Sequence, residues 1–258
     1  VNAIVPAVVP SVAIRLVRES GCRTVKVKVA GSRETTEQDV ARVAAVRRAL
    51  GSDGRIRIDA NGAWTVDEAE RALARLGEFG LEYVEQPCAS LREMAQLRRR
   101  VDVPLAVDEA IRKAPDPLHV DLVSEAADVL VVKSAPLGGV AAAGAVAARY
   151  GLPVVVSSAL DTSVGLAGGL ALAAALPGMP MACGLGTGRL LSGDVVRDPL
   201  VPLNGRLTVR RPAVDPDLLS SVRAPASVLA GWRQRVIAAW TALPPGIPTS
   251  TASTGGRT

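Results

Sequence analysis

The sequence has 258 residues, of which 48% are hydrophobic and 21% are charged, so the chain can bury a large core and is not globally disordered. Its net charge is +5, and its arginines are spread along predicted helices rather than gathered with aromatic residues, which argues against a nucleic-acid-binding protein. Cys22, Cys88 and Cys183 are too few and too scattered for a disulfide framework or a zinc site, and they indicate a reducing compartment, the cytoplasm.

Strand-like and helix-like segments alternate from the first residues onward. The predicted strands are residues 3–5, 24–30, 55–59, 81–85, 105–108, 129–133 and 154–157, with a weak eighth strand near 181–183. Between them, helices are predicted, among others, over residues 36–50, 66–79, 91–100, 140–150 and 164–176. Because the strands are rich in β-branched residues and too apolar for a two-faced sheet, they favour parallel strands covered by helices. The regular repeat predicts a TIM-type (β/α) barrel over residues 1–194.

The later part of the chain departs from this alternation. Residues 164–185 are apolar enough to resemble a membrane span, but Pro177 and Pro180 interrupt them, so a buried helix is predicted and no membrane association. Residues 195–243 are predicted to be a C-terminal extension that packs on the barrel and includes one amphipathic helix. Residues 244–258 consist mostly of Pro, Ser, Thr and Gly and are predicted to be a disordered tail.

Four charged residues stand at the ends of four successive predicted strands, namely Asp59, Glu85, Asp108 and Lys133. In a parallel barrel their side chains converge on the carboxyl-terminal face. Three carboxylates meeting there would repel one another unless a hard cation held them, and oxygen ligands suit Mg²⁺. One such carboxylate alone is more often a helix cap, but the set in phase predicts a metal site with a lysine beside it.

The second predicted strand carries two lysines in the segment TVKVKVA. Lys26 and Lys28 are two residues apart, so both side chains point to the same face of the strand, whereas Val25, Val27 and Val29 point to the covering helices. Lysines directed into a barrel interior need carboxylate partners or must line the mouth of an active site. A lysine close to a metal ion and other ammonium groups can serve as a general base near neutral pH.

The Lys-x-Lys pair, the three carboxylates and the later lysine occur in an order that resembles the enolase superfamily, muconate-lactonizing subgroup. Within it, the segments DANGAW, EQPC, VDEAIRKAPDP, VKSAPLGG, VVVSSALDTSVG and ACGLGTG are similar to those of actinobacterial o-succinylbenzoate synthases. The resemblance covers roughly residues 1–194. It implies an enzyme of menaquinone biosynthesis that dehydrates 2-succinyl-6-hydroxy-2,4-cyclohexadiene-1-carboxylate to o-succinylbenzoate. It also implies Mg²⁺ as cofactor, with Mn²⁺ as a possible substitute.

The resemblance implies a role for each matching residue. The three carboxylates would ligate the metal ion, which would bind the carboxylate of a small substrate and stabilise an enediolate. Lys28 would remove the α-proton and then help the hydroxyl group to leave. Lys26 would tune Lys28, and Lys133 would hold its ammonium group against the developing anion. The one histidine, His119, is not at a strand end, so the histidine base of another superfamily branch is not available.

Five further residues are candidates for a supporting role, and four of them have two interpretations. Asn61 and Glu109 could orient the metal carboxylates, although an Asn-Gly turn would explain Asn61 equally well. Ser157 and Ser158 could donate hydrogen bonds to the succinyl group or cap the following helix. Arg57 points to the interior, either as a substrate-side group or as a partner of the carboxylates, and the sequence does not decide between these.

Two other functions remain open at this point. An N-acylamino acid racemase or dipeptide epimerase needs an acid or base on each face of the substrate, and Lys28 and Lys133 could supply both. The other alternative is a non-catalytic barrel. Members of the superfamily carry an N-terminal α+β capping domain, whereas this sequence starts at VNAIVPAV, which looks like the first barrel strand. A barrel without its cap is therefore predicted: either the sequence is a fragment or a mis-started reading, or the protein works with an open mouth. The oligomeric state is not predicted.

Overall fold

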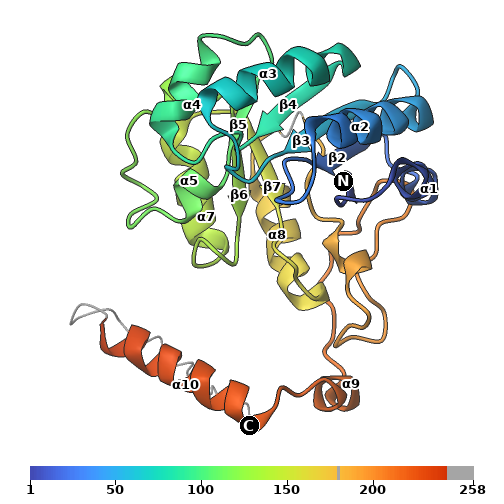
Figure 1. Ribbon diagram of the computed structural model, residues 1–258. Helices are drawn as coiled ribbons and strands as arrows, with labels where there is room; N and C mark the ends of the chain where they lie inside the picture. Colours follow the sequence, from blue (N-terminus) through green and yellow to red (C-terminus); the bar gives the residue numbers. More distant parts are fainter. Residues whose placement is uncertain (179–180, 243–258) are drawn as a thin grey trace, which may run out of the picture. The chain divides into compact units, whose positions relative to one another are not determined.

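The computed structural model describes residues 1–178 and 181–242, and the chain divides into two compact units, of which the first is Val1–Asp215. In this unit seven strands form one parallel sheet in which each strand pairs with the next in sequence (Figure 1). The strands are β1 (Ala3–Val5), β2 (Thr24–Lys28), β3 (Arg55–Asp59), β4 (Leu81–Glu85), β5 (Leu105–Val107), β6 (Val129–Lys133) and β7 (Val154–Ser157). The predicted α/β fold with parallel strands is confirmed.

Helices connect consecutive strands of the sheet. The longer ones are α1 (Pro10–Ser20), α2 (Thr36–Leu50), α3 (Val66–Leu76), α4 (Leu91–Arg98), α7 (Val140–Tyr150) and α8 (Ser163–Ala175). Two short helices, α5 (Glu109–Arg112) and α6 (Val123–Ala126), lie between β5 and β6, and single 3₁₀ turns cover Gly77–Phe79 and Thr187–Leu190. The short helices were not among the predicted elements, since four residues are too few for a helical repeat of apolar residues to be recognised.

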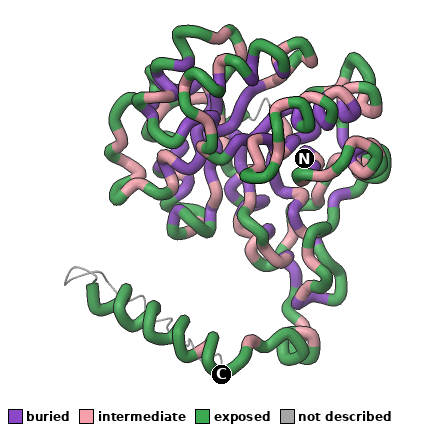
Figure 2. The backbone as a smooth tube through the Cα atoms, viewed as in Figure 1, coloured by how far each residue is buried: buried purple, intermediate pink, exposed green. Residues whose placement is uncertain are grey.

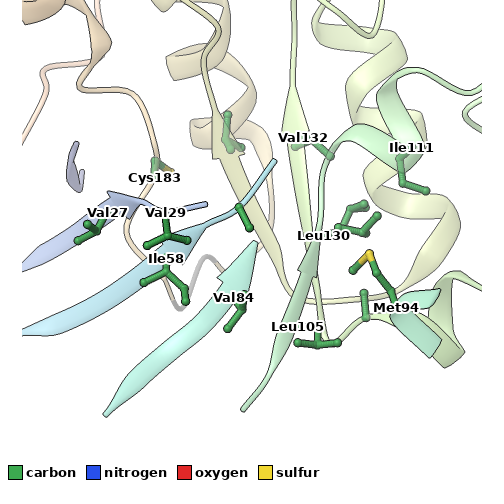
Figure 3. Close-up of a cluster of buried hydrophobic side chains, with 14 of the residues drawn as sticks. Val27, Val29, Ile58, Val84, Met94, Leu105, Ile111, Leu130, Val132 and Cys183 are labelled. Atoms are coloured by element: carbon green, nitrogen blue, oxygen red, sulfur yellow. The ribbon is translucent and has the colours of Figure 1, made fainter. Parts of the chain in front are cut away.

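The core lies between the strands and the helices, as the buried strand segments in Figure 2 show. Alternate residues of the strands, such as Val25, Val27, Ile56 and Ile58, are completely buried, and Figure 3 shows several members of this cluster. Because side chains alternate along a strand, the residues between them, Lys26 among them, point to the opposite side. The sequence-based assignment of the two faces of β2 is therefore confirmed.

The starts of three helices are fixed by their own side chains. α2, α3 and α4 each begin with a capping box. In each box the hydroxyl oxygen of the N-cap residue (Thr35, Thr65 or Ser90) accepts a hydrogen bond from the backbone N–H of the third helical residue. Such a cap contributes about 1 kcal/mol. The caps fix the ends of the loops that connect β2 to α2, β3 to α3 and β4 to α4. Residues of these loops, such as Asn61 and Gln86, are described below.

The predicted eighth strand near residues 181–183 is not formed as a regular strand. Instead, Gly184 makes a single parallel bridge to Ser157, and Cys183 O accepts a hydrogen bond from Asn2 N at 2.9 Å. The segment thus joins both edge strands of the sheet, β7 and β1, through a few backbone contacts. A Cβ atom at Gly184 would lie 2.5 Å from Ser157 Oγ, so this close approach requires glycine.

The first unit extends past residue 194, the predicted end of the barrel domain, to Asp215. The second unit begins at Pro216, and its described part contains α9 (Pro216–Ser221) and α10 (Ala226–Thr241). α10 coincides with the helix predicted in the extension, and none of its residues is buried. The packing of the extension on the barrel stays a prediction, and the predicted disordered tail, residues 244–258, lies outside the described residues.

No helix in the described part of the chain is long and apolar enough to cross a membrane.

Candidate active site

Strand register brings the predicted site residues together at the carboxyl end of the sheet. Lys28, the last residue of β2, pairs in register with Asp59, and Asp59 pairs with Glu85 at the end of β4. Asp108 directly follows β5, and Lys133 is the last residue of β6. The structure therefore places the lysines and carboxylates found by sequence spacing on one edge of consecutive strands.

Lys26 and Lys28 neutralise the carboxylates of β3 and β4. Lys26 Nζ lies 2.7 Å from Glu85 Oε1 and 3.2 Å from Asp59 Oδ2. Lys28 Nζ lies 2.5 Å from the same Asp59 oxygen. The side chain of Lys28 is 35% exposed, whereas that of Lys26 is 7% exposed. Lys28 is therefore the one of the two that a small molecule could reach.

Asp108 accepts hydrogen bonds from two cationic side chains. Lys133 Nζ lies 2.5 Å from Asp108 Oδ2, and Arg112 Nε lies 2.9 Å from Asp108 Oδ1. Arg112 also donates from Nη2 to Glu109 Oε1 at 2.6 Å. The sequence reasoning missed Arg112. Its spacing of four residues from Asp108 was the available signal, because residues four apart lie on the same face of a helix.

Asn61 and Glu109 connect the Lys28–Asp59 pair to the group formed by Asp108 and Arg112. Asn61 Oδ1 accepts a hydrogen bond from Lys28 Nζ at 2.8 Å, and Asn61 Nδ2 donates to Glu109 Oε1 at 3.1 Å. The backbone N–H of Asn61 donates to Asp59 Oδ1 at 3.1 Å. Asn61 thus makes a turn and also contacts the cluster, so the two interpretations of this residue are compatible.

Burial and ion pairing act against each other on the pKa values. Burial favours the neutral form of Asp59, but the charges of Lys26 and Lys28 outweigh it and lower the pKa of Asp59 to about 2. For Glu85, burial together with repulsion from Asp59 and Asp108 outweighs the attraction of Lys26 and raises the pKa to about 7. Burial disfavours the charged form of Lys26, yet Glu85 and Asp59 raise its pKa well above the usual value. Lys26 therefore stays an ammonium group and is poorly suited to accept a proton.

Asp59, Glu85 and Asp108 offer carboxylate oxygens, the type of ligand that a divalent cation binds, although in this structure they are paired with lysines. Among residues 1–178 and 181–242, no three acidic, histidine or cysteine side chains gather closely enough to form a metal cluster, and Lys26 bonds to both Asp59 and Glu85. Within the same residues, Glu85 Oε2 is buried without a hydrogen-bond partner. A buried carboxylate oxygen without a donor is costly, and a hard cation would satisfy it, because such ions take carboxylate oxygens as ligands.

The two candidate serines lie at the end of β7, but their hydroxyl groups bond to the chain itself. Ser157 Oγ donates to Gly184 O at 3.3 Å, and Ser158 Oγ donates to the same oxygen at 2.8 Å. Ser158 Oγ also lies 2.8 Å from Thr187 Oγ1. Both serines therefore help to hold the Gly184 segment against β7, and their contact with a substrate stays a prediction.

Arg57 takes no part in the cluster, although the sequence left it as a candidate. Its side chain is completely buried, and Nε donates to Glu82 Oε2 at 2.5 Å. Nη1 donates to Ala182 O at 2.7 Å and to Asn2 Oδ1 at 3.2 Å, and the guanidinium lies 4.7 Å from the centroid of the Tyr83 ring. Arg57 therefore ties β3, β4, Asn2 and the Ala182 segment together.

A buried pair on α2, which sequence reasoning also missed, holds the end of β2. Arg42 Nη1 donates to Lys28 O at 2.8 Å and to Asp39 Oδ1 at 2.8 Å. Asp39 Oδ2 in turn accepts the backbone N–H of Ala30 at 2.9 Å. In sequence, an Asp and an Arg three residues apart on a helix are typical of a solvated face, so nothing indicated that both are buried.

Residues just after β2, β3 and β4 have left-handed backbone conformations. The φ angles are 59° at Ala30, 50° at Asn61 and 39° at Gln86. For residues other than glycine this conformation costs about 1–3 kcal/mol, and such strain clusters at functional sites. Its repetition beside the lysine and carboxylates supports the view that these loops are shaped for the site.

Comparison with known proteins agrees with the site. The family model for Enolase C-terminal domain-like proteins matches residues 10–214. The chain is 58% identical over 239 residues to the o-succinylbenzoate synthase of Thermobifida fusca (strain YX), a match that covers 93% of this chain and 74% of the relative. The chain belongs to the o-succinylbenzoate synthase family of the enolase superfamily.

Other relatives of this o-succinylbenzoate synthase family member support the same placement. The o-succinylbenzoate synthase of Mycobacterium tuberculosis (strain ATCC 25618 / H37Rv) is 51% identical over 247 residues, which cover 95% of this chain and 74% of the relative. The crystal structure of a mandelate racemase/muconate lactonizing family protein from Azoarcus sp. EbN1 superposes with a TM-score of 0.75 at 27% identity, covering 86% of this chain and 64% of that one. The resemblance seen in the sequence motifs is confirmed.

Proposed function

We propose that this chain is a Mg²⁺-dependent o-succinylbenzoate synthase of menaquinone biosynthesis, with Mn²⁺ as a possible substitute. It would convert 2-succinyl-6-hydroxy-2,4-cyclohexadiene-1-carboxylate to o-succinylbenzoate and water. The observation that carries the proposal is the cluster in which Lys28 and Lys133 pair with different carboxylates at the ends of consecutive strands, on a chain 58% identical to an o-succinylbenzoate synthase. A cytoplasmic location is part of this proposal, since the chain has only three cysteines and they are widely spaced in the sequence.

Asp59, Glu85 and Asp108 would hold the cation. When bound, it would supply a Lewis acid that stabilises negative charge on the substrate carboxylate as the α-proton leaves. Lys26, which contacts both Asp59 and Glu85, would offset part of the negative charge around the cation.

Lys28 would carry the proton. Its Nζ is the more accessible of the β2 ammonium groups and would, in its neutral form, take the α-proton as the C–H bond breaks. The resulting ammonium group would return that proton to the hydroxyl group on the same face, and the C–O bond would break with release of water. Lys133, held by Asp108 at 2.5 Å, would present a fixed positive charge to the anion from the other side.

The neighbouring polar residues would position these groups. Asn61 would orient Lys28 through its 2.8 Å hydrogen bond, and Glu109 would orient both Asn61 and Arg112. To donate hydrogen bonds to the succinyl group, Ser157 and Ser158 would have to give up those that they donate to Gly184 O.

Dehydration by the purified chain tests this proposal. With Mg²⁺ present we expect turnover, and with excess EDTA we expect none. Lys28→Ala should lower kcat by roughly 10²–10⁴-fold, because a positioned acid–base group contributes about that much. Lys113→Ala, a change at an exposed lysine outside the cluster, is the matched control and should keep full activity. Unchanged turnover in Lys28→Ala would contradict the assignment.

An N-acylamino acid racemase or dipeptide epimerase is the alternative function. It is favoured by one observation, the placement of Lys28 and Lys133 on separate carboxylates, Asp59 and Asp108, which gives two ammonium groups that could act on opposite faces. Dehydration with both proton transfers on one face needs only Lys28. Lys133→Ala should therefore abolish any racemisation of an N-acylamino acid more completely than it reduces dehydration, and equal losses would argue against a racemase.

A further inference from the structure

Asp108 occupies the N-cap position of α5, yet its side chain makes no capping hydrogen bond. Aspartate is favoured at this position because its carboxylate can accept the N–H of the second or third helical residue. Here the two carboxylate oxygens bond to Lys133 and Arg112 instead. The first amides of α5 therefore need an acceptor from elsewhere in the chain.

The side chain of Gln86 supplies that acceptor. Gln86 Oε1 accepts from Asp108 N at 3.0 Å and from Ala110 N at 3.2 Å. The other end of the amide is also held, since Nε2 donates to Cys88 O at 2.9 Å and lies 3.3 Å from Met94 Sδ. Gln86 is completely buried, so its amide has one fixed orientation.

The backbone of Gln86 is held equally firmly. Its N–H donates to Ala106 O at 2.8 Å, and its carbonyl accepts from Gly62 N at 2.7 Å. The φ angle of 39° lies in a region that residues other than glycine rarely adopt. Gln86 thus connects β4 to β5 and to the loop after β3, the strand ends that carry the three carboxylates.

We propose that Gln86 is a positioning residue for the cation site, because it caps α5 in place of Asp108 and so keeps the Asp108 carboxylate directed at the site. This inference rests on the proposed function, in which Asp108 is a metal ligand. Without the Gln86 amide, the Asp108 carboxylate becomes the nearest acceptor for the α5 amides, and it would leave Lys133 to cap its own helix.

The experiment compares Gln86→Met with the wild type and with Ser90→Ala. Ser90→Ala removes the cap of the neighbouring helix α4 and is matched in kind, but it does not touch the cluster. Mn²⁺ binding to each metal-free protein is measured by titration, and amide exchange of Asp108 and Ala110 by NMR. We expect the dissociation constant for Mn²⁺ to rise about tenfold or more in Gln86→Met, as for other residues that orient metal ligands, and to stay unchanged in Ser90→Ala. Both amides should exchange faster in Gln86→Met.

Mn²⁺ affinity that is unchanged in Gln86→Met, or lowered equally in Ser90→Ala, would overturn the inference. If Gln86→Met does not fold, the wild type decides: slow exchange at Asp108 and Ala110 supports the cap, and fast exchange refutes it. A wild-type protein that binds no Mn²⁺ would refute the proposed function. If the wild type binds Mn²⁺ and Gln86→Met has the same dissociation constant, only the positioning role is refuted.

Discussion

At the scale of single residues, the site consists of lysine ammonium groups paired with buried carboxylates. Lys26 bonds to Asp59 and Glu85 at once, yet one oxygen of Glu85 remains without a partner in the described chain. Within the site, burial outweighs ion pairing at Glu85 and raises the pKa of this carboxyl group, so we expect Glu85 to add a pH dependence to the stability of the metal-free protein.

We predict that the metal-free protein loses stability as the pH rises from about 4.5 to about 7. The pKa of Glu85 is raised from 4.5 to about 7 in the folded chain. In this window the unfolded chain has therefore already released the proton that the folded chain keeps. Because the folded state binds more protons here, the free energy of unfolding decreases with increasing pH and levels off above about 7.

The measurement is urea unfolding in EDTA at several pH values. Glu85→Gln, which cannot ionise, should lack this slope and should be more stable than the wild type at pH 8. Identical pH profiles for the two proteins would show that another group is responsible. At pH 6, binding of Mg²⁺ to the wild type should release protons, because the cation needs the ionised carboxylate.

At the scale of elements, α2 fixes the end of the strand that carries the candidate base. Arg42 and Asp39 bond to the backbone on either side of the β2 terminus, and both side chains are almost fully buried, with 2% and 3% exposed. This pair differs in kind from the nearby Arg75–Glu37 pair, whose side chains are 47% and 70% exposed.

We predict that Arg42→Met lowers the free energy of unfolding by about 3–5 kcal/mol, because it leaves the buried Asp39 without its cation. Arg75→Met, the matched change in an exposed pair, should cost less than about 1 kcal/mol. Urea unfolding of both variants in EDTA separates the two cases. Similar losses in the two variants would mean that the α2 pair does not anchor β2.

The elements show where sequence reasoning succeeds and where it fails. Seven strands and most of the long helices could be predicted because their apolar residues repeat with a clear period. Asp59, Glu85, Asp108 and Lys133 could be predicted because each ends a predicted strand, and Lys26 and Lys28 because they alternate with valines within one. The eighth strand was wrong because close backbone approach at Gly184, rather than a β-branched run, joins the sheet edges. Contacts between residues far apart in sequence have no such local signal.

The same limit explains which residues were missed at the site. Gln86 hydrogen-bonds to Asp108 N across two strands, and Arg42 reaches from α2 to the backbone of Lys28. In sequence, a glutamine before a proline and an arginine on a helix are typical of loops and solvated faces. Only the fold reveals that both are buried and that both hydrogen-bond to a residue of the proposed site.

At the scale of the whole molecule, the chain consists of two compact units that meet in sequence at Asp215 and Pro216. All of the proposed site residues lie in the first unit. In the second, the large apolar residues Trp232, Val236 and Trp240 of α10 are more than half exposed. The first unit therefore contains everything that the proposed chemistry uses.

We predict that a chain ending at Asp215 folds cooperatively, binds Mn²⁺ as tightly as the full chain and unfolds at a similar temperature, because its core lies within the first unit. Thermal unfolding followed by circular dichroism, together with Mn²⁺ titration, checks this. A large drop in the unfolding temperature would instead show that the residues after Asp215 stabilise the first unit, which would favour the predicted packing of residues 195–243 on the barrel.

Residues 183–184, which join the β7 and β1 edges of the sheet, affect how the protein folds. All strand pairs from β1–β2 to β6–β7 join neighbours in the chain, whereas the Asn2–Cys183 hydrogen bond connects segments that are far apart in sequence. Such contacts form late, because the entropy of closing a long loop must be lost first. A refolding chain therefore passes through an open sheet whose β1 and β7 edges carry unpaired backbone groups, and such edges recruit other chains. Aggregation would then be a hazard of refolding, and the closed native sheet would be protected from it.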